Sequence, residues 1–104
     1  MTGGNVRRMQ SIVNEEAEFR LVVREVFTIT GRGLVAAGSI ESGAIRTGEV
    51  VNVVHEGRVQ SVECRGVEII RTIRPLDYVP VGLLLPELTK DDVAAGDPIT
   101  RGPR

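Results

Sequence analysis

Apolar and polar residues alternate along several short segments of this chain, and the alternation is clearest over Val26–Thr30. Phe27 and Ile29 fall on one side of an extended chain and the two threonines on the other, which is typical of a half-buried β-strand. The tripeptide Gly31-Arg32-Gly33 follows at once. Two glycines around one arginine favour a tight hairpin because glycine accepts positive φ angles. We therefore predict a hairpin whose second strand runs over 34–40 and whose tip exposes the arginine.

The segment before this hairpin, 18–30, is long for one strand and carries two conflicting apolar patterns. Most of its apolar residues share one parity, which Glu25 interrupts, whereas Val22 and Val26 have the other parity. A β-bulge would reconcile the two patterns, because one extra residue changes the side to which the following residues point. We therefore predict a bulge or bend near Arg24-Glu25.

Further short β-rich segments, separated by glycine and proline, follow along the chain. Seven or so strands with almost no helix indicate an all-β protein, and we expect a small closed barrel because closure hides the sheet edges. Residues 18–104 form this single domain, and we predict that 1–17 is a flexible tail, although its apolar residues also fit a short amphipathic helix. The strands expected after the hairpin are 50–54, 58–65, 67–73, 79–85 and 97–101, with a connector over 86–95 that has room for one helical turn.

The composition agrees with this interpretation and narrows the possible partners. The 104 residues contain 24 valines and isoleucines but only three aromatic residues, and β-branched residues favour sheet. The net charge of −1 disfavours a nucleic-acid binder that works by bulk attraction, although 13 basic residues leave room for a local patch. No apolar run is long enough to span a membrane, so we expect a cytoplasmic protein with no membrane partner.

The residues that could support catalysis are few. Cys64 and His55 are the only cysteine and the only histidine, so they make neither a disulfide nor a structural zinc site. We predict that Cys64 is a buried apolar residue and that His55 is a solvated turn residue. Gly31-Arg32-Gly33 lacks the third glycine of a dinucleotide loop, and no phosphate-binding P-loop is present. We therefore expect no enzyme activity, no cofactor, no metal and no bound nucleotide.

Several phrases of the sequence, in the right order, resemble a known family. The segment from Phe19 to Arg101, about four-fifths of the chain, is similar to the second, β-barrel domain of the translational GTPases, and most similar to that of elongation factor Tu. The resemblance implies a closed, six-stranded Greek-key barrel, here without a GTP-binding segment in the 104 residues. The phrases are VFTITGRG (26–33), VAAG (35–38), IESG (40–43), IRTGEVV (45–51), GVE (66–68), VGLLL (81–85) and KDDVAAGD (90–97).

The resemblance also implies a partner and a binding face. In elongation factor Tu this domain helps to hold the aminoacylated 3′ end of transfer RNA and touches the RNA of the small ribosomal subunit. Arg71 matches a family arginine, whereas Arg24 stands in place of one of two family acids and Pro80 in place of a family asparagine. We therefore expect a non-enzymatic binding module that contacts RNA, ribosomal or transfer, or a ribonucleoprotein. The predicted partner-binding residues are Arg24, Glu25, Gly31, Arg32, Gly33 and Arg71.

A second hypothesis has no role for RNA. The barrel would then be a scaffold for a protein partner or for self-association. The near-neutral charge favours this alternative, and so would exposure of the apolar run Val79–Leu88. Salt dependence separates the two hypotheses, because phosphate contacts weaken steeply with salt and apolar contacts do not.

Overall fold

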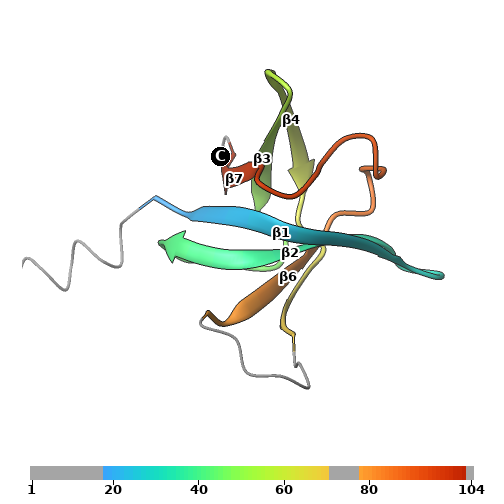
Figure 1. Cartoon of the computed structure of the whole chain (residues 1–104). Coiled ribbons are helices and arrows are strands. Elements are labelled where there is room, and N and C mark those ends of the chain that lie inside the picture. Colours follow the sequence, from blue (N-terminus) through green and yellow to red (C-terminus); the bar gives the residue numbers. More distant parts are fainter. Residues whose placement is uncertain (1–17, 71–77, 103–104) are drawn as a thin grey trace, which may run out of the picture.

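The computed structural model describes residues 18–70 and 78–102, which form one antiparallel sheet of seven strands with no helix among them (Figure 1). This confirms the all-β prediction. The predicted tail over 1–17 lies outside the described residues. No helix in the described ranges is long and apolar enough to cross a membrane. The strands are β1 (Arg20–Ile29), β2 (Gly33–Ser42), β3 (Val50–His55), β4 (Arg58–Glu63), β5 (Gly66–Ile69), β6 (Pro80–Leu84) and β7 (Pro98–Arg101).

The sheet has the order β4-β3-β7-β1-β2-β6-β5, so its two end strands are consecutive in the chain. Only Cys64 and Arg65 separate them. The Cys64 N–H donates to the Glu49 carbonyl beside β3 (2.8 Å), and the Arg65 N–H donates to the Leu84 carbonyl of β6 (2.9 Å). The chain therefore passes from one end of the sheet to the other between two adjacent residues.

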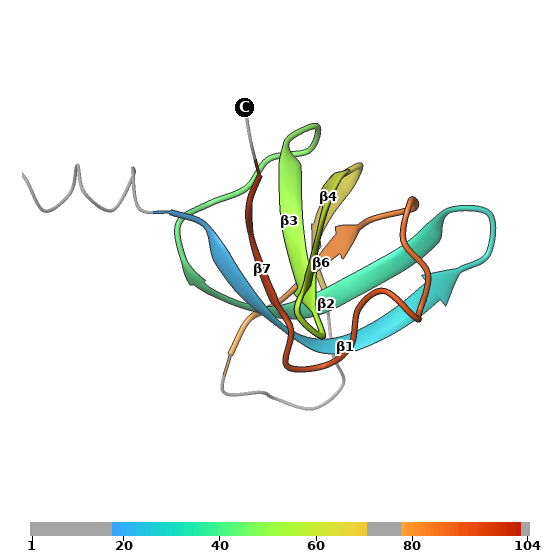
Figure 2. The same cartoon turned by 90° about the horizontal axis from the view of Figure 1, so that it is seen from above.

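The observed sheet differs from the closed six-stranded barrel that we expected. Between β4 and β5 there is no ladder of hydrogen bonds in the described parts of the chain, so the sheet is not closed in that way. It is nevertheless curled, and Figure 2 shows β3, β4, β6 and β7 rising above the long β1–β2 pair. The corner at Cys64–Arg65 separates β4 from β5, as the two predicted strands 58–65 and 67–73 are separate, and this makes seven strands where the family resemblance implied six.

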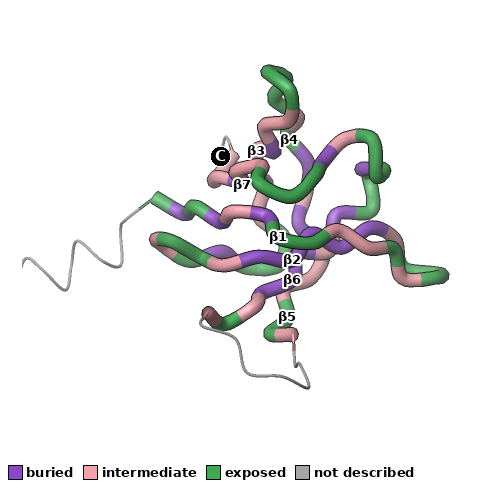
Figure 3. Tube along the Cα trace, in the orientation of Figure 1, coloured by how far each residue is buried: buried purple, intermediate pink, exposed green. Residues whose placement is uncertain are grey.

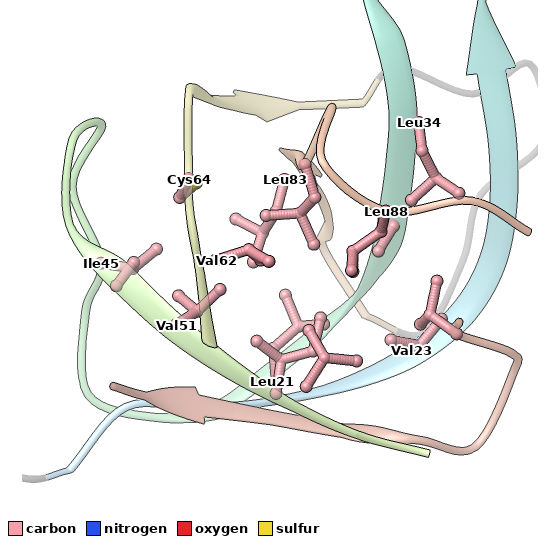
Figure 4. Close-up of a cluster of buried hydrophobic side chains, with 14 of the residues drawn as sticks. Leu21, Val23, Leu34, Ile45, Val51, Val62, Cys64, Leu83 and Leu88 are labelled. Atoms are coloured by element: carbon pink, nitrogen blue, oxygen red, sulfur yellow. The ribbon is translucent and has the colours of Figure 1, made fainter. Parts of the chain in front are cut away.

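The curled sheet surrounds one apolar core, to which every strand except β5 contributes buried residues, while Val67 of β5 is partly buried and packs against it (Figure 4). Figure 3 shows buried and more exposed residues alternating along the start of β1, as the pleat requires, whereas β2 carries an unbroken run of buried residues. Cys64 is fully buried in this core, as predicted, and Leu88 and Val93 from the β6–β7 connector complete it. The cluster comprises Phe19, Leu21, Val23, Leu34, Ala36, Ile45, Val51, Val53, Val62, Cys64, Val81, Leu83, Leu85, Leu88, Val93 and Ile99.

The predicted bulge in β1 is confirmed by a shift of its register against β2 between Val23 and Glu25. Before the bulge, β1 pairs with both β2 and β7, and its ladder with β7 ends at Val22. Val23 then bonds the turn before β7, donating to Asp97 (2.9 Å) and accepting from Gly96 (2.7 Å). Beyond this point β1 pairs with β2 and leaves β7. The bulge is thus where β1 bends out of one half of the sheet.

The prediction for His55 was wrong. Its side chain is only 16% exposed, and its Nδ1 lies 2.7 Å from Oδ2 of Asp97, which precedes β7. The same carboxylate oxygen accepts the Ala94 N–H (2.8 Å). His55 therefore ties the end of β3 to the β6–β7 connector. This connector contains hydrogen-bonded turns in place of the helical turn for which it had room.

Gly38→Ala is expected to destabilise the protein strongly. A Cβ at Gly38 would overlap the Val22 carbonyl and lie 3.0 Å from the Val23 Cα, both of them backbone atoms at the bulge. Because backbone cannot rotate away, we expect a loss of about 3 kcal/mol, the upper end of overpacking costs. Urea unfolding measures this loss. Ser39→Ala, one residue along β2, is the control and should change stability by less than about 0.5 kcal/mol. Equal stability of Gly38→Ala and wild type would contradict this account of the bend.

Candidate functional site

The outer face of β1, β2, β6 and β5 carries an apolar cluster of its own. Val35 and Ala37 of β2 are only 6% and 5% exposed, yet neither belongs to the core cluster. Because successive strand residues point to opposite faces, these two are covered from outside the sheet. The strand registers define two adjacent rows of residues across this face, Phe27-Val35-Leu84-Gly66 and Glu25-Ala37-Gly82-Glu68.

A pocket of about 270 Å³ opens on this face. Two of its positions are glycines, Gly66 and Gly82, which contribute no side chain to the lining. A Cβ at Gly82 would lie 2.9 Å from Ile70 Cδ1 and 3.1 Å from Val35 Cγ1, so these side chains pack directly over the glycine. The volume is just below the range of about 300–1,000 Å³ typical of pockets for drug-sized ligands. The pocket is lined by Phe27, Ile29, Arg32, Val35, Gly66, Glu68, Ile69, Ile70, Gly82 and Leu84.

Two opposite charges lie in the lining of this mostly apolar pocket. Nη1 of Arg32, from the β1–β2 turn, is 3.7 Å from Oε2 of Glu68 on β5. Both side chains are at least half exposed, so their attraction is weak and water can replace it. The pocket therefore presents a guanidinium and a carboxylate that are both available to a ligand.

The predicted hairpin explains how Arg32 reaches the pocket. The Arg32 N–H donates to the Ile29 carbonyl (2.9 Å), and the flanking glycines have positive φ angles of 82° at Gly31 and 121° at Gly33. A Cβ at Gly33 would also lie 2.8 Å from the Pro86 Cβ, whereas one at Gly31 would meet open space. The two glycines thus shape the turn, and the arginine between them lines the pocket.

The bulge exposes two further predicted residues, Arg24 and Glu25. Neither lines the pocket, although Glu25 belongs to one of the two rows of the outer face. The Arg24 guanidinium carbon lies 4.6 Å from the centre of the Tyr78 ring, a cation–π distance. Arg71, the last predicted residue, lies outside the described residues. The structure thus places Arg32 at the pocket and the bulge pair elsewhere on β1.

Sequence reasoning missed several residues of this site. Glu68 stood in a phrase used for the resemblance but received no role, and Phe27 and Ile29 were assigned only to a strand. Tyr78, just before the predicted strand 79–85, likewise received no role. The available signal was the pairing of GVE with VGLLL, since glycines on neighbouring strands let other residues approach the sheet closely at that place.

The described part of the chain contains neither a metal-binding cluster nor a reactive thiol. Within residues 18–70 and 78–102, no group of three or more His, Cys, Asp or Glu side chains could hold a metal ion. Cys64 is fully buried, its Sγ lies 3.3 Å from the Gly66 carbonyl, and burial raises the pKa of its thiol. A raised pKa means little thiolate at neutral pH and low reactivity.

No model of a known protein family matches the sequence.

Cys64 should resist labelling by Ellman's reagent at pH 8 in the folded protein. Because the thiol is buried and its pKa is raised, labelling requires opening of the core. We expect native labelling to be at least about a hundredfold slower than labelling in urea. The matched control is the double variant C64A/V59C, which moves the thiol to a position that is 60% exposed on β4, the strand just before Cys64. Labelling of Cys64 as fast as that of the control would contradict its placement.

Proposed function

We propose that this protein is a non-enzymatic RNA-binding module of the kind found as the second domain of translational GTPases. The observation that carries the proposal is the pocket on the outer face, apolar over most of its lining and flanked by Arg32 and Glu68. Single-stranded RNA is read by inserting unstacked bases against apolar or aromatic surfaces and by contacts to base edges. A pocket of about 270 Å³ suits one planar base better than a larger ligand.

Each part of the pocket has a role in this proposal. The side chains of Phe27, Ile29 and Leu84 contact the faces of the base. The Glu68 carboxylate accepts hydrogen bonds from an amino group on the edge of the base, and Arg32 donates to a phosphate or a base acceptor. The weak Arg32–Glu68 pair (3.7 Å) is exchanged for these contacts at little cost.

The charge and composition favour recognition of one unpaired base rather than coating of a long strand. The net charge of −1 provides no bulk attraction for RNA, so affinity depends on local contacts. Three aromatic residues in the whole chain are too few for successive stacking platforms. The module therefore binds a particular unpaired nucleotide within a larger RNA or ribonucleoprotein.

The distribution of the family-like phrases supports the same proposal. VFTITGRG forms the end of β1 and the hairpin, VAAG lies on β2, GVE lies on β5 and VGLLL forms most of β6. All four phrases supply residues to the one pocket. We also infer the finer fold of the family, a closed six-stranded barrel, in which β4 and β5 count as the two halves of one strand bent at Cys64–Arg65.

The alternative of a protein-interaction barrel has less support. The apolar run that favoured it is mostly core, since Val81, Leu83, Leu85 and Leu88 are all buried. Among its valines and leucines only Val79 is strongly exposed, at 62%. The run therefore builds the interior and offers no extended apolar surface.

Binding of short single-stranded RNA, measured by fluorescence anisotropy at two salt concentrations, tests the proposal. Gly66→Val should weaken binding about tenfold or more by filling the pocket. A Cβ at position 66 has its nearest contact at 3.4 Å, on Leu84, and valine favours strand, so the fold should persist. Arg32→Gln should weaken binding and lower the slope of log affinity against log salt by about one.

Two variants serve as controls for that experiment. Arg46→Gln removes an exposed arginine that does not line the pocket, and Val59→Ala trims an exposed apolar residue on β4. Both should bind RNA like the wild type. Cosedimentation with ribosomal subunits then identifies the larger partner. Absence of RNA binding at both salt concentrations would refute the proposal, and salt-independent cosedimentation would support protein docking in its place.

A further inference from the structure

Arg24 and Tyr78 form a second feature on the sheet, separate from the pocket lining. The Arg24 guanidinium carbon is 4.6 Å from the centre of the Tyr78 ring. Arg24 belongs to β1, and Tyr78 precedes β6, whereas β2 lies between these two strands in the sheet. Two strand spacings are about 10 Å, so the long side chains meet above β2. Beside the bulge the β2 residues are small, Gly38 opposite Val23 and Ala37 opposite Glu25, so they leave room for the Arg24 side chain.

The position of the pair relates it to the pocket. Arg24 lies three residues before Phe27 on β1, which corresponds to about 10 Å along a strand. Tyr78 lies four residues before Gly82, so both members approach the pocket from the same direction along their strands. Arg24 is therefore close enough to the pocket to contact a phosphate that flanks a base held there.

The two arginines of this region differ in what neutralises them. Arg32 is paired with Glu68, whereas Arg24 makes no ion pair with a carboxylate of the described residues. The cation–π contact with the tyrosine uses none of the guanidinium N–H donors in a hydrogen bond, so these donors stay available. An oriented guanidinium with free edge donors matches the paired oxygens of a phosphate. The ring also reduces the freedom that Arg24 would otherwise lose when it binds.

We propose that Arg24, held against Tyr78, is a phosphate subsite that acts together with the pocket on one nucleotide unit of an RNA strand. The base fills the pocket and a phosphate attached to that nucleotide is bound at Arg24. This proposal rests on the RNA-binding function proposed above. A terminal phosphate monoester carries more charge than an internal diester, so strands that end in a phosphate are the preferred ligands.

Three RNA trinucleotides of one sequence test the subsite, with hydroxyls at both ends, a 3′-phosphate or a 5′-phosphate. Each is titrated into ¹⁵N-labelled protein, and the NMR shifts of the Arg24 side-chain N–H and of the pocket amides are followed. We expect one phosphorylated strand to bind about fivefold more tightly, the upper end for an exposed ion pair. Arg24→Gln and Tyr78→Leu should remove this preference, and the control Arg46→Gln should keep it.

The outcomes separate the subsite from the function on which it rests. An equal loss of affinity for all three strands in Arg24→Gln would support the subsite and assign it to an internal phosphodiester. Unchanged binding of all three strands by Arg24→Gln, with loss in Gly66→Val, would overturn the subsite and leave the RNA-binding function standing. No shift with any strand at low salt would overturn both.

Discussion

The structure depends on the close approach of the β1 backbone to Gly38, which lets one long strand serve two faces of the sheet. Before the bulge, Leu21 and Val23 point into the core and β1 is paired on both edges. After it, Phe27 lines the outer pocket and β1 has left β7. A side chain at position 38 would push the two strands apart at the bend. The same bend exposes Arg24, so core, pocket and basic residue share one geometric cause.

The second constraint is the corner at Cys64–Arg65, where the chain joins the two ends of the sheet. Within the corner the Cys64 thiol is buried in the core, and one residue after the corner Gly66 lines the pocket. The inner and outer apolar clusters are therefore connected by a few covalent bonds. A site built in this way is held by strands on every side, and rigid placement lowers the entropy lost when a ligand binds.

Alternation within single segments was enough to predict the all-β fold and the bulge near Arg24, the two glycines predicted the Gly31-Arg32-Gly33 hairpin, and the usual behaviour of a lone cysteine predicted the burial of Cys64. Each of these features depends on neighbours in the chain. The contact of His55 with Asp97 joins residues 42 apart, and no local pattern specifies it. The pocket likewise depends on the register of four strands, two of them distant from the hairpin in sequence. Arg32 was predicted because its turn is specified by adjacent residues. Glu68 was missed because the residue it lies beside, Arg32, is distant in the sequence.

A nearly neutral protein can bind a polyanion only through groups whose surroundings leave them available. Arg32 and Arg24 meet this requirement in different ways, one through a weak and exposed pair with a carboxylate, the other through stacking on a ring. Arg101, by contrast, donates to Glu49 (2.6 Å) and to the Ala44 carbonyl (2.7 Å) and is committed to holding β7. The number of arginines therefore says little about RNA binding in this chain. What decides it is which guanidinium groups keep free donors beside an apolar hollow, and in the proposed site these are the two on the β1–β2 hairpin.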